Sequence, residues 1–316
     1  NAPTFTMQYY SDSGLTSSLG NNPKLKAGTY YIKISASEAL AAAPTISIAA
    51  EGTANDVTDA ATTLVSGNDY RYTRVVASDA SAVGTTIENF SVTGTDNFSN
   101  ASTNANPTDE ATKAGYTDTV LPTSPGTATL NSYLNNTGNQ TVSWTQVTEA
   151  SFQDYLVQRK TGVGGTFATV GSPITNIATV SYADNSALAE GTYYYQVIAE
   201  DTAGNTATSA TSSVLTVDKT APILQSFTSS STNSDPDDPL TMYGTGDTIN
   251  IQAVFNENLA SGSTMTVELE NTARSQVVLN QISGSTLYGT YTVSGPHDGI
   301  SDDSIDLAVR RVVSMS

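Results

Sequence analysis

Alternation of apolar and polar residues recurs along nearly the whole chain, and this pattern restricts the possible folds more than any other feature. Residues 193–199 and 249–255 each place an apolar side chain at every second position. Successive side chains of a strand point to opposite faces of a sheet, so a period of two predicts strands with one buried face. Helical periodicity is nearly absent, and the most helix-like stretch, 38–43, ends at a proline that disfavours helix before it. The predicted fold class is therefore all β.

The length of the chain and its internal repeats predict about three domains. One β-sandwich takes roughly 100 residues, and the chain has 316. The linker-like segment 118–122 recurs at 218–222, and the turn-like segment 96–100 recurs at 201–205. These repeats predict sandwiches at 1–106, 122–217 and 218–316. A linker is predicted between the first two, at 107–121.

Several motifs of the middle block point to a known family. Pro122 and Pro125 open the block, Trp144 lies on its expected second strand, and 188–193 ends in a tyrosine after a turn-like sequence. With these motifs the block, 122–217, resembles a fibronectin type III domain. The resemblance implies that Trp144 anchors the core. It also implies that the Tyr193 hydroxyl bonds to backbone at a corner between two strands.

The first and third blocks share a second motif. In each, an alternating strand is followed by a glutamate and, two residues later, by a leucine: Glu38 and Leu40, Glu257 and Leu259. Each block then continues with a second alternating strand. These blocks resemble bacterial Ig-like repeats of large adhesins and surface-layer proteins. The two resemblances together cover nearly the whole chain and imply tandem β-sandwich domains.

The charge of the chain excludes several kinds of partner. Thirty acidic residues oppose 12 basic ones, for a formal net charge of −18. A nucleic-acid partner or an anionic lipid surface needs a cationic face, so neither is expected. An acidic surface can instead recruit divalent cations. The chain has no cysteine and no apolar run of about 20 residues that could span a membrane. These features fit an extracellular, secreted location without direct membrane insertion.

Catalytic motifs are lacking in the sequence. His297 is the single histidine, so with no cysteine a zinc site has too few nitrogen or sulfur ligands. A serine–histidine triad would have to use His297, which lies in a turn-like loop, and the sequence has no nucleophile-elbow motif. Glycoside hydrolysis needs only two carboxylates but also a cleft lined with aromatic residues. Trp144 is the single tryptophan, and its position on a strand predicts the core instead. We therefore expect no enzymatic activity.

Clusters of loop carboxylates are the candidate metal ligands, and the expected ion is Ca²⁺. Calcium takes six to eight oxygen ligands, several of them from carboxylates and backbone carbonyls on loops. Two loops and one linker supply the candidates, which are Asp235, Asp237 and Asp238; Asp298, Asp302 and Asp303; and Asp218. Asp118 occupies the position of Asp218 in the earlier repeat, and calcium at such junctions would stiffen a string of domains. The alternative is that these aspartates only form exposed turns.

The two ends of the sequence are out of phase with its repeats. Residues 1–4 resemble the end of the linker at 220–222, and the third block stops where the others show their Asp-x-x-x-Asn turn and final strand. We therefore expect the strand run 304–313 to reach a sheet edge. Either the next stretch of the same polypeptide, which we favour, or a strand from a neighbouring subunit would cover that edge.

The function follows from this architecture only by analogy. The leading hypothesis is a structural or adhesive module of an extracellular cell-surface protein: a surface layer, a filament or an adhesin stalk. Its partners would be neighbouring copies or further repeats of the same protein, and glycans or a host surface. The alternative is a set of carbohydrate-binding or spacer modules of a secreted polysaccharide-degrading enzyme. Paired tyrosines such as Tyr9-Tyr10 and Tyr193-Tyr194-Tyr195 would be its sugar-binding candidates.

Overall fold

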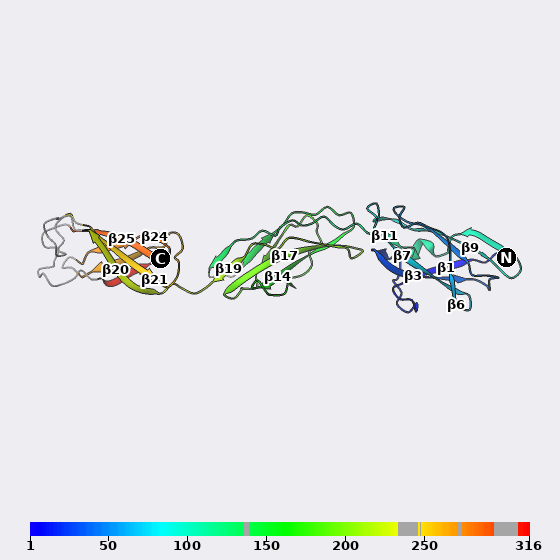
Figure 1. The fold of residues 1–316 in the computed structure, drawn as a ribbon, viewed down its shortest axis with the longest axis horizontal. Helices are drawn as coiled ribbons and strands as arrows, with labels where there is room; N and C mark the ends of the chain where they lie inside the picture. The colour runs from blue at the N-terminus through cyan, green and yellow to red at the C-terminus, as the bar shows by residue number, and fades with distance from the viewer. Residues whose placement is uncertain (136–138, 233–245, 247, 271–273, 294–308) are drawn as a thin grey trace. The chain divides into compact units, whose positions relative to one another are not determined.

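The fold is almost entirely β, as the alternation predicts (Figure 1). The computed structural model describes residues 1–316 except 136–138, 233–245, 247, 271–273 and 294–308. The chain forms two compact units, 1–219 and 220–316. The described residues form three separate hydrophobic clusters, two in the first unit and one in the second. The predicted fold class, tandem Ig-like and fibronectin type III-like sandwiches, is confirmed.

The first sandwich consists of two four-stranded sheets and a small third sheet. One sheet has the order β1 (Phe5–Tyr10), β3 (Gly28–Ala36), β7 (Asp69–Val76), β6 (Thr63–Ser66). The facing sheet has the order β10 (Ala101–Ala105), β9 (Asn89–Thr95), β4 (Thr45–Ala49), β5 (Val57–Ala61). The small sheet has the order β2 (Lys24–Leu25), β11 (Tyr116–Asp118), β8 (Val83–Ile87).

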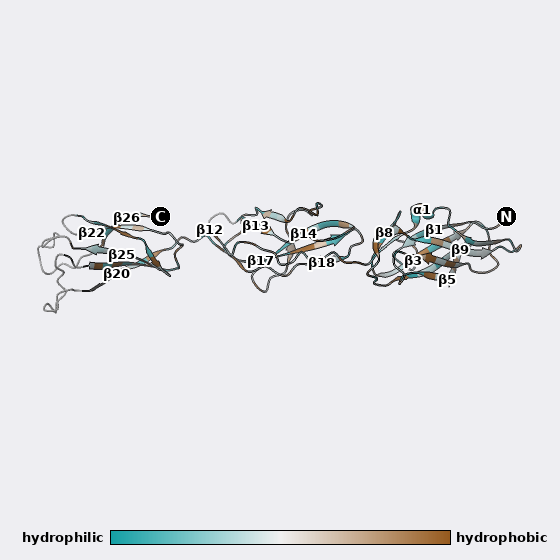
Figure 2. Cartoon of the chain, turned by 90° about the horizontal axis from the view of Figure 1, so that it is seen from above, coloured by the Kyte–Doolittle hydropathy of each residue, from teal (hydrophilic) through white to brown (hydrophobic). Residues whose placement is uncertain are grey.

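Alternate residues of these strands form the first core. Ile32 and Ile34 of β3 and Ile46 and Ile48 of β4 are at most 1% exposed. Phe90 of β9 packs into the same cluster. The hydropathy of neighbouring residues changes along the strands, as a sheet with one buried face requires (Figure 2).

The segment expected as a linker, 107–121, is largely structured. Its helix α1 (Glu110–Lys113) packs against β1, and the Met7 amide donates to Asp109 Oδ1 at 2.8 Å. Its strand β11 pairs with β2 in parallel and with β8 antiparallel. The Thr117 hydroxyl donates to Glu88 Oε1 at 2.9 Å, and Glu88 forms a fully buried ion pair with Arg74. The end of the first sandwich is therefore fixed to its core up to β11.

The second sandwich has one large and one small sheet. The large sheet has the order β12 (Tyr133–Asn135), β19 (Leu215–Asp218), β17 (Gly191–Asp201), β14 (Phe152–Thr161), β15 (Ala168–Thr169), and β18 (Thr206–Thr208) also pairs with β17. The small sheet joins β13 (Gln140–Ser143) to β16 (Ser181–Asp184). The long antiparallel pair β14 and β17 forms the centre of this sandwich (Figure 1).

Both residues that the family resemblance singled out lie where it implies. Trp144 is 6% exposed and meets the Tyr155 ring edge-on, with 5.3 Å between the ring centroids. The buried face of β17, which includes Tyr193 and Tyr195, belongs to the same cluster. The Tyr193 hydroxyl donates to the Ala189 carbonyl at 2.9 Å, four residues upstream. The predicted core anchor and tyrosine corner are therefore confirmed.

The third sandwich repeats the strand order of the first. One sheet has the order β20 (Leu224–Thr232), β21 (Thr248–Phe255), β25 (Thr286–Thr292), β24 (Gln281–Ser283). The other has the order β23 (Gln276–Leu279), β22 (Met265–Leu269), β26 (Val309–Met315). The first sheet corresponds strand for strand to β1-β3-β7-β6. The second corresponds to β5-β4-β9, so no described strand takes the position that β10 has in the first sandwich.

Candidate metal site

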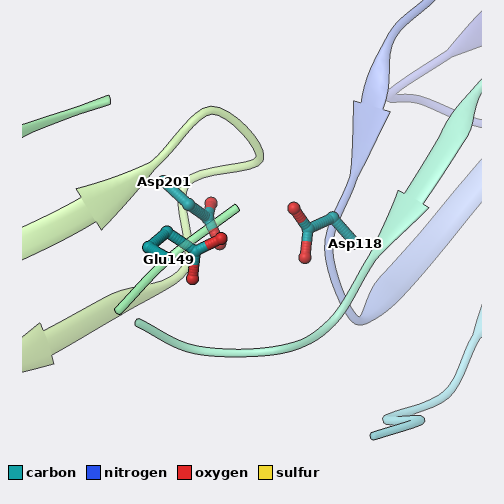
Figure 3. Close-up of side chains that lie close together, drawn as sticks. All are labelled: Asp118, Glu149 and Asp201. Atoms are coloured by element: carbon teal, nitrogen blue, oxygen red, sulfur yellow. The ribbon is translucent and has the colours of Figure 1, made fainter. Parts of the chain in front are cut away.

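Three carboxylates meet where the first sandwich gives way to the second (Figure 3). Asp118 ends β11 of the first sandwich, Glu149 lies in the loop before β14, and Asp201 ends β17. One oxygen from each lies within 4.8 Å of the others, and this is the single such group among the described residues. The carboxylate of Asp118 faces those of Glu149 and Asp201 across the junction (Figure 3). Asp118 and Asp201 are fully buried, and Glu149 is half-buried.

A tight turn fixes Asp201. Its Oδ1 accepts hydrogen bonds from the amides of Ala203 and Asn205, at 2.8 and 2.9 Å. Its Oδ2 accepts one from the Asn205 side-chain amide at 2.8 Å. Gly204 has a φ of +82°, a left-handed conformation that glycine adopts without strain. The Asp-x-x-x-Asn sequence therefore specifies the turn locally.

Direct hydrogen bonds connect the two sandwiches around the carboxylates. The Asn205 side chain donates to the Asp118 carbonyl at 3.0 Å. Lys26 Nζ donates to the Gly204 carbonyl at 3.1 Å. The Ser151 hydroxyl lies 2.7 Å from Asp118 Oδ2 and 2.9 Å from the Val83 carbonyl. A hydroxyl has one proton, so Ser151 serves only one of these two acceptors at a time.

The Asp118 carboxylate lacks the partners that a buried charge requires. Its Oδ1 is buried and accepts no hydrogen bond within the described chain. The backbone at Gly84 closes over the same side chain, since a Cβ placed there would come within 2.6 Å of Asp118 Oδ2. An ionised carboxylate in such a place is costly unless a cation or hydrogen-bond donors compensate it. One of the two Asp118 oxygens lies in the group formed with Glu149 and Asp201.

The electrostatics of the junction favour a cation. Desolvation raises the pKa of Asp118, and the nearby Asp201 charge raises it further. Desolvation also raises the pKa of Glu149, with further contributions from Asp118 and Asp201. The Ser151 hydrogen bond is the largest effect that lowers the pKa of Asp118, and the Val120 backbone and the Lys24 charge lower it less. The negative charge at the junction is therefore only partly balanced by the protein itself.

The geometry fits a hard divalent cation. Oxygens bound to one Ca²⁺ at about 2.4 Å lie at most about 4.8 Å apart, and the three carboxylates satisfy that limit. Oxygen ligands without nitrogen or sulfur favour Ca²⁺ or Mg²⁺ over zinc or copper. Calcium tolerates irregular coordination and accepts carboxylates from flexible loops, whereas Mg²⁺ requires near-ideal octahedral geometry. The junction is therefore a candidate calcium site.

Most of the metal ligands predicted from the sequence lie outside the described residues. These are Asp235, Asp237, Asp238, Asp298, Asp302 and Asp303. Asp218 ends β19, and its Oδ2 accepts a hydrogen bond from the Tyr133 hydroxyl at 2.9 Å. Its role as a ligand stays a prediction.

Among the described residues, Asp118 is the one aspartate considered from the sequence that lies in a group of three carboxylates. The sequence analysis did not identify Glu149 or Asp201 as ligands. A signal for both exists: Asp201 opens a repeated turn, and Glu149 follows its strand as Glu38 and Glu257 follow theirs.

Of the comparisons with known proteins, the one with solved structures gives matches. No family model matches the chain, and no curated protein matches it. A fibronectin type III-like protein from Clostridium thermocellum is 26% identical over 30% of this chain and 93% of its own, with a TM-score of 0.23. A structure described for host cell surface retention of a 1.5-MDa bacterial ice-binding adhesin is 19% identical, covering 92% of this chain and 88% of its own, with a TM-score of 0.32.

A tetra-tandem repeat from the extending region of a large adhesion protein is also similar. It is 17% identical, covers 94% of this chain and 67% of its own, and has a TM-score of 0.27. Since these TM-scores are all below 0.5, we take the fold from the strand pairing described above. Within the described ranges, no helix is long and apolar enough to cross a membrane. The chain is a series of Ig-like and fibronectin type III-like sandwiches.

Proposed function

We propose that the chain is a non-catalytic structural and adhesive segment of an extracellular cell-surface protein. The first and second sandwiches in it are held in a fixed arrangement by calcium. The observation that carries this proposal is the junction, where carboxylates from two sandwiches meet within 4.8 Å. Like charges at that distance repel when nothing lies between them. A divalent cation between them converts the repulsion into a bridge.

The backbone contacts of the junction support a role in spacing. Asn205 and Ser151 each bond to a backbone carbonyl of the first sandwich, that of Asp118 and that of Val83. Because the acceptors are carbonyl groups, these hydrogen bonds depend on the path of the main chain more than on the neighbouring side chains. They restrict the angle between the two sandwiches, which a flexible glycine- or serine-rich linker would leave free. A protein that extends and positions a distant binding surface needs such restricted junctions.

The burial of three candidate tyrosines favours this role over sugar binding, whereas the candidate Tyr10 is half-buried. Tyr9, Tyr193 and Tyr195 are at most 6% exposed and belong to the two cores of the first unit. A buried ring cannot stack on a sugar. The Tyr194 ring faces outward on β17 but lies near the Lys160 ammonium, 5.2 Å from its centroid. Further repeats or neighbouring copies of the same protein are therefore the proposed partners.

Calcium titration of the 316-residue chain tests the proposal. Binding to the native state alone stabilises it by about 2.7 kcal/mol at a hundredfold excess of ion over Kd. We expect the unfolding transition of the second sandwich to move to higher temperature in calcium and back in EDTA. Small-angle X-ray scattering should show a narrower distribution of conformations with calcium.

A charge variant and its control make this test specific. Glu149→Gln keeps an oxygen that can accept from the Ser151 amide, now bonded at 2.8 Å, but removes one charge of the group. It should weaken calcium binding strongly. Glu38→Gln changes the corresponding glutamate of the first sandwich and should leave binding unchanged. Equal calcium responses in both variants would contradict the proposed site, and electron microscopy of the native protein on cells would test the surface location separately.

A further inference from the structure

The chain contains five Asn-x-Ser/Thr sequons, the acceptor sequence for N-linked glycans. Their first residues are Asn89, Asn97, Asn100, Asn135 and Asn139. The structure describes four of them in full, and the one at Asn135 continues into residues that it does not describe. A glycan is added only where a transferase reaches both the asparagine and the hydroxyl two positions later. The fold around each sequon therefore decides which asparagine is modified.

Two of the described sequons are held in strands. One, 89–91, begins β9, and the other, 139–141, enters β13. Their central residues, Phe90 and Gln140, are 0% and 2% exposed. Both stretches are paired within their sheets, β9 with β4 and β13 with β16. A transferase could bind either sequon only after part of a sandwich had unfolded, which costs free energy.

The sequon at Asn100 is exposed at its asparagine, but its reactive groups are already bonded. Asn100 Nδ2 donates to Asp96 Oδ2 at 2.7 Å, a bond within the turn 96–100. The hydroxyl of Ser102, a buried residue, donates to the Pro3 carbonyl. Glycosylation would need this nitrogen as the nucleophile and this hydroxyl for recognition. Modification of Asn100 would thus break two bonds of the fold.

The sequon at Asn97 differs in each of these respects. Asn97, Phe98 and Ser99 are all exposed, and Phe98 is exposed over 85% of its surface. Neither the Asn97 amide group nor the Ser99 hydroxyl has a hydrogen-bond partner among the residues that the structure describes. Asp96 fixes the backbone here, because its Oδ1 accepts from the Phe98 amide at 2.8 Å. The turn therefore presents both side chains to solvent and uses neither of them to hold its shape.

We propose that Asn97 is an N-glycosylation site, with a polyprenyl pyrophosphate-linked oligosaccharide as the glycosyl donor. The Asn97 side-chain nitrogen forms a bond to C1 of the first sugar, and the bond between that carbon and the donor's phosphate oxygen breaks. The nitrogen loses one proton, the lipid pyrophosphate leaves with the electron pair of the broken bond, and nothing is oxidised or reduced. This inference rests on the proposed extracellular location, since N-linked glycans belong to secreted chains.

The sequons at Asn89 and Asn97 separate the effect of the fold from that of the sequence. Both have the same tripeptide, Asn-Phe-Ser, so an enzyme that reads only the sequon would treat them alike. The first lies in a core strand and the second in an exposed turn. In the corresponding turn of the second sandwich Thr202 takes the position of Asn97, and that turn has no sequon. Modification is therefore expected at the turn of the first sandwich.

Glycopeptide mass spectrometry of the native protein tests the proposal. We expect a glycan on the peptide that contains Asn97 and none at Asn89, Asn100 or Asn139. An unmodified Asn97 overturns the proposal. Equal modification of Asn89 also overturns it, because the sequence and not the folded turn would then determine the site. Calcium titration of the chain without glycan and electron microscopy on cells report the proposed function separately, so the two proposals fail independently.

Glycan transfer to the purified 316-residue chain supplies the matched controls. The enzyme is an oligosaccharyltransferase that modifies the free peptides 87–93 and 95–101 equally well. On the folded chain it should modify Asn97 at least about tenfold faster than Asn89, whose sequon must first unfold. Asn97→Gln and Ser99→Ala should each abolish transfer to the turn, whereas Ser91→Ala should leave it unchanged. Equal rates at the two asparagines, or transfer to the turn of Ser99→Ala at the rate of the unmodified sequence, would contradict the proposal.

Discussion

The turns 96–100 and 201–205 have the same internal structure and different surroundings. In each, the first aspartate accepts two amide hydrogen bonds through Oδ1 and one from the asparagine side chain through Oδ2. In each, the fourth residue has a positive φ, +64° at Ser99 and +82° at Gly204. The second turn lies against another sandwich, with Asn205 bonded to the Asp118 carbonyl. The first turn exposes 85% of Phe98.

This difference separates what the turn does for its own sandwich from what it does for a neighbour. The internal bonds lie between β9 and β10 in the first sandwich and between β17 and β18 in the second, and they need no neighbour. The junction adds one bond from Asn205 and a place in the carboxylate group for Asp201. The same local sequence therefore has a structural role in both sandwiches and a second role in one.

Of the changes considered, the loss of the core tryptophan of the second sandwich should have the largest effect on stability. Trp144→Ala removes a side chain that is 6% exposed and packed on Tyr155. Such substitutions cost roughly 3–5 kcal/mol. By calorimetry, the transition of the second sandwich should shift to lower temperature while that of the first stays unchanged. An unchanged profile would show that Trp144 does not hold the strands that carry Asp201.

Removing the aspartate of each turn should destabilise both sandwiches similarly but affect calcium binding in only one. Asp201→Ala and Asp96→Ala each remove three accepted hydrogen bonds, and we expect each to cost about 2 kcal/mol. Only Asp201→Ala should abolish the response to calcium. The fluorescence of the single tryptophan, Trp144, reports the second sandwich, and hydrogen exchange reports the first. A lost calcium response in Asp96→Ala would break the comparison.

Substituting the asparagine of each turn measures how much the hydrogen bond across the junction contributes to stability. Asn205→Ala removes the bonds to Asp201 and to the Asp118 carbonyl, whereas Asn100→Ala removes only the bond to Asp96. We expect Asn205→Ala to cost about 1 kcal/mol more, the net value of one hydrogen bond. Urea unfolding of both variants gives the difference. Equal costs would mean that the junction bond contributes nothing in solution.

Acidification should have the smallest effect, and its sign should depend on calcium. The pKa values of Asp118 and Glu149 are raised in the folded chain, chiefly by desolvation. A raised acid pKa means that the native state binds the proton more tightly, so this contribution to stability grows as the pH falls through the folded pKa. In EDTA this contribution to stability should therefore rise as the pH falls toward about 4, the ordinary range of a carboxyl pKa. In calcium, protonation displaces the ion and the contribution reverses.

The control for the pH measurement is Asp118→Asn, which cannot titrate. Other carboxylates, such as that of Asp184, have lowered pKa values and destabilise the fold in acid. Subtracting the pH dependence of stability of Asp118→Asn from that of the unmodified chain isolates the contribution of Asp118. If thermal melts show the same pH dependence for both, Asp118 carries no raised pKa.

Local patterns predicted the strands and the core, because alternation and turn residues act within a few positions. The roles of Trp144 and Tyr193 came from the resemblance to a fibronectin type III domain. The strand β11 was not predicted, since three residues carry no periodicity and its place depends on β2 and β8, far away in sequence. The group of Asp118, Glu149 and Asp201 comes from three separate segments. Its existence depends on how two sandwiches meet, which no local pattern encodes.

The parallel pairing of β12 with β19 has a mechanical consequence. These strands lie near the entry and the exit of the second sandwich, and three residue pairs join them. Tension on the two ends of this domain would slide parallel strands along each other, loading the three pairs together. An antiparallel hairpin pulled at its open end would instead separate one pair at a time. The domain should thus resist extension along the chain better than its equilibrium stability alone indicates.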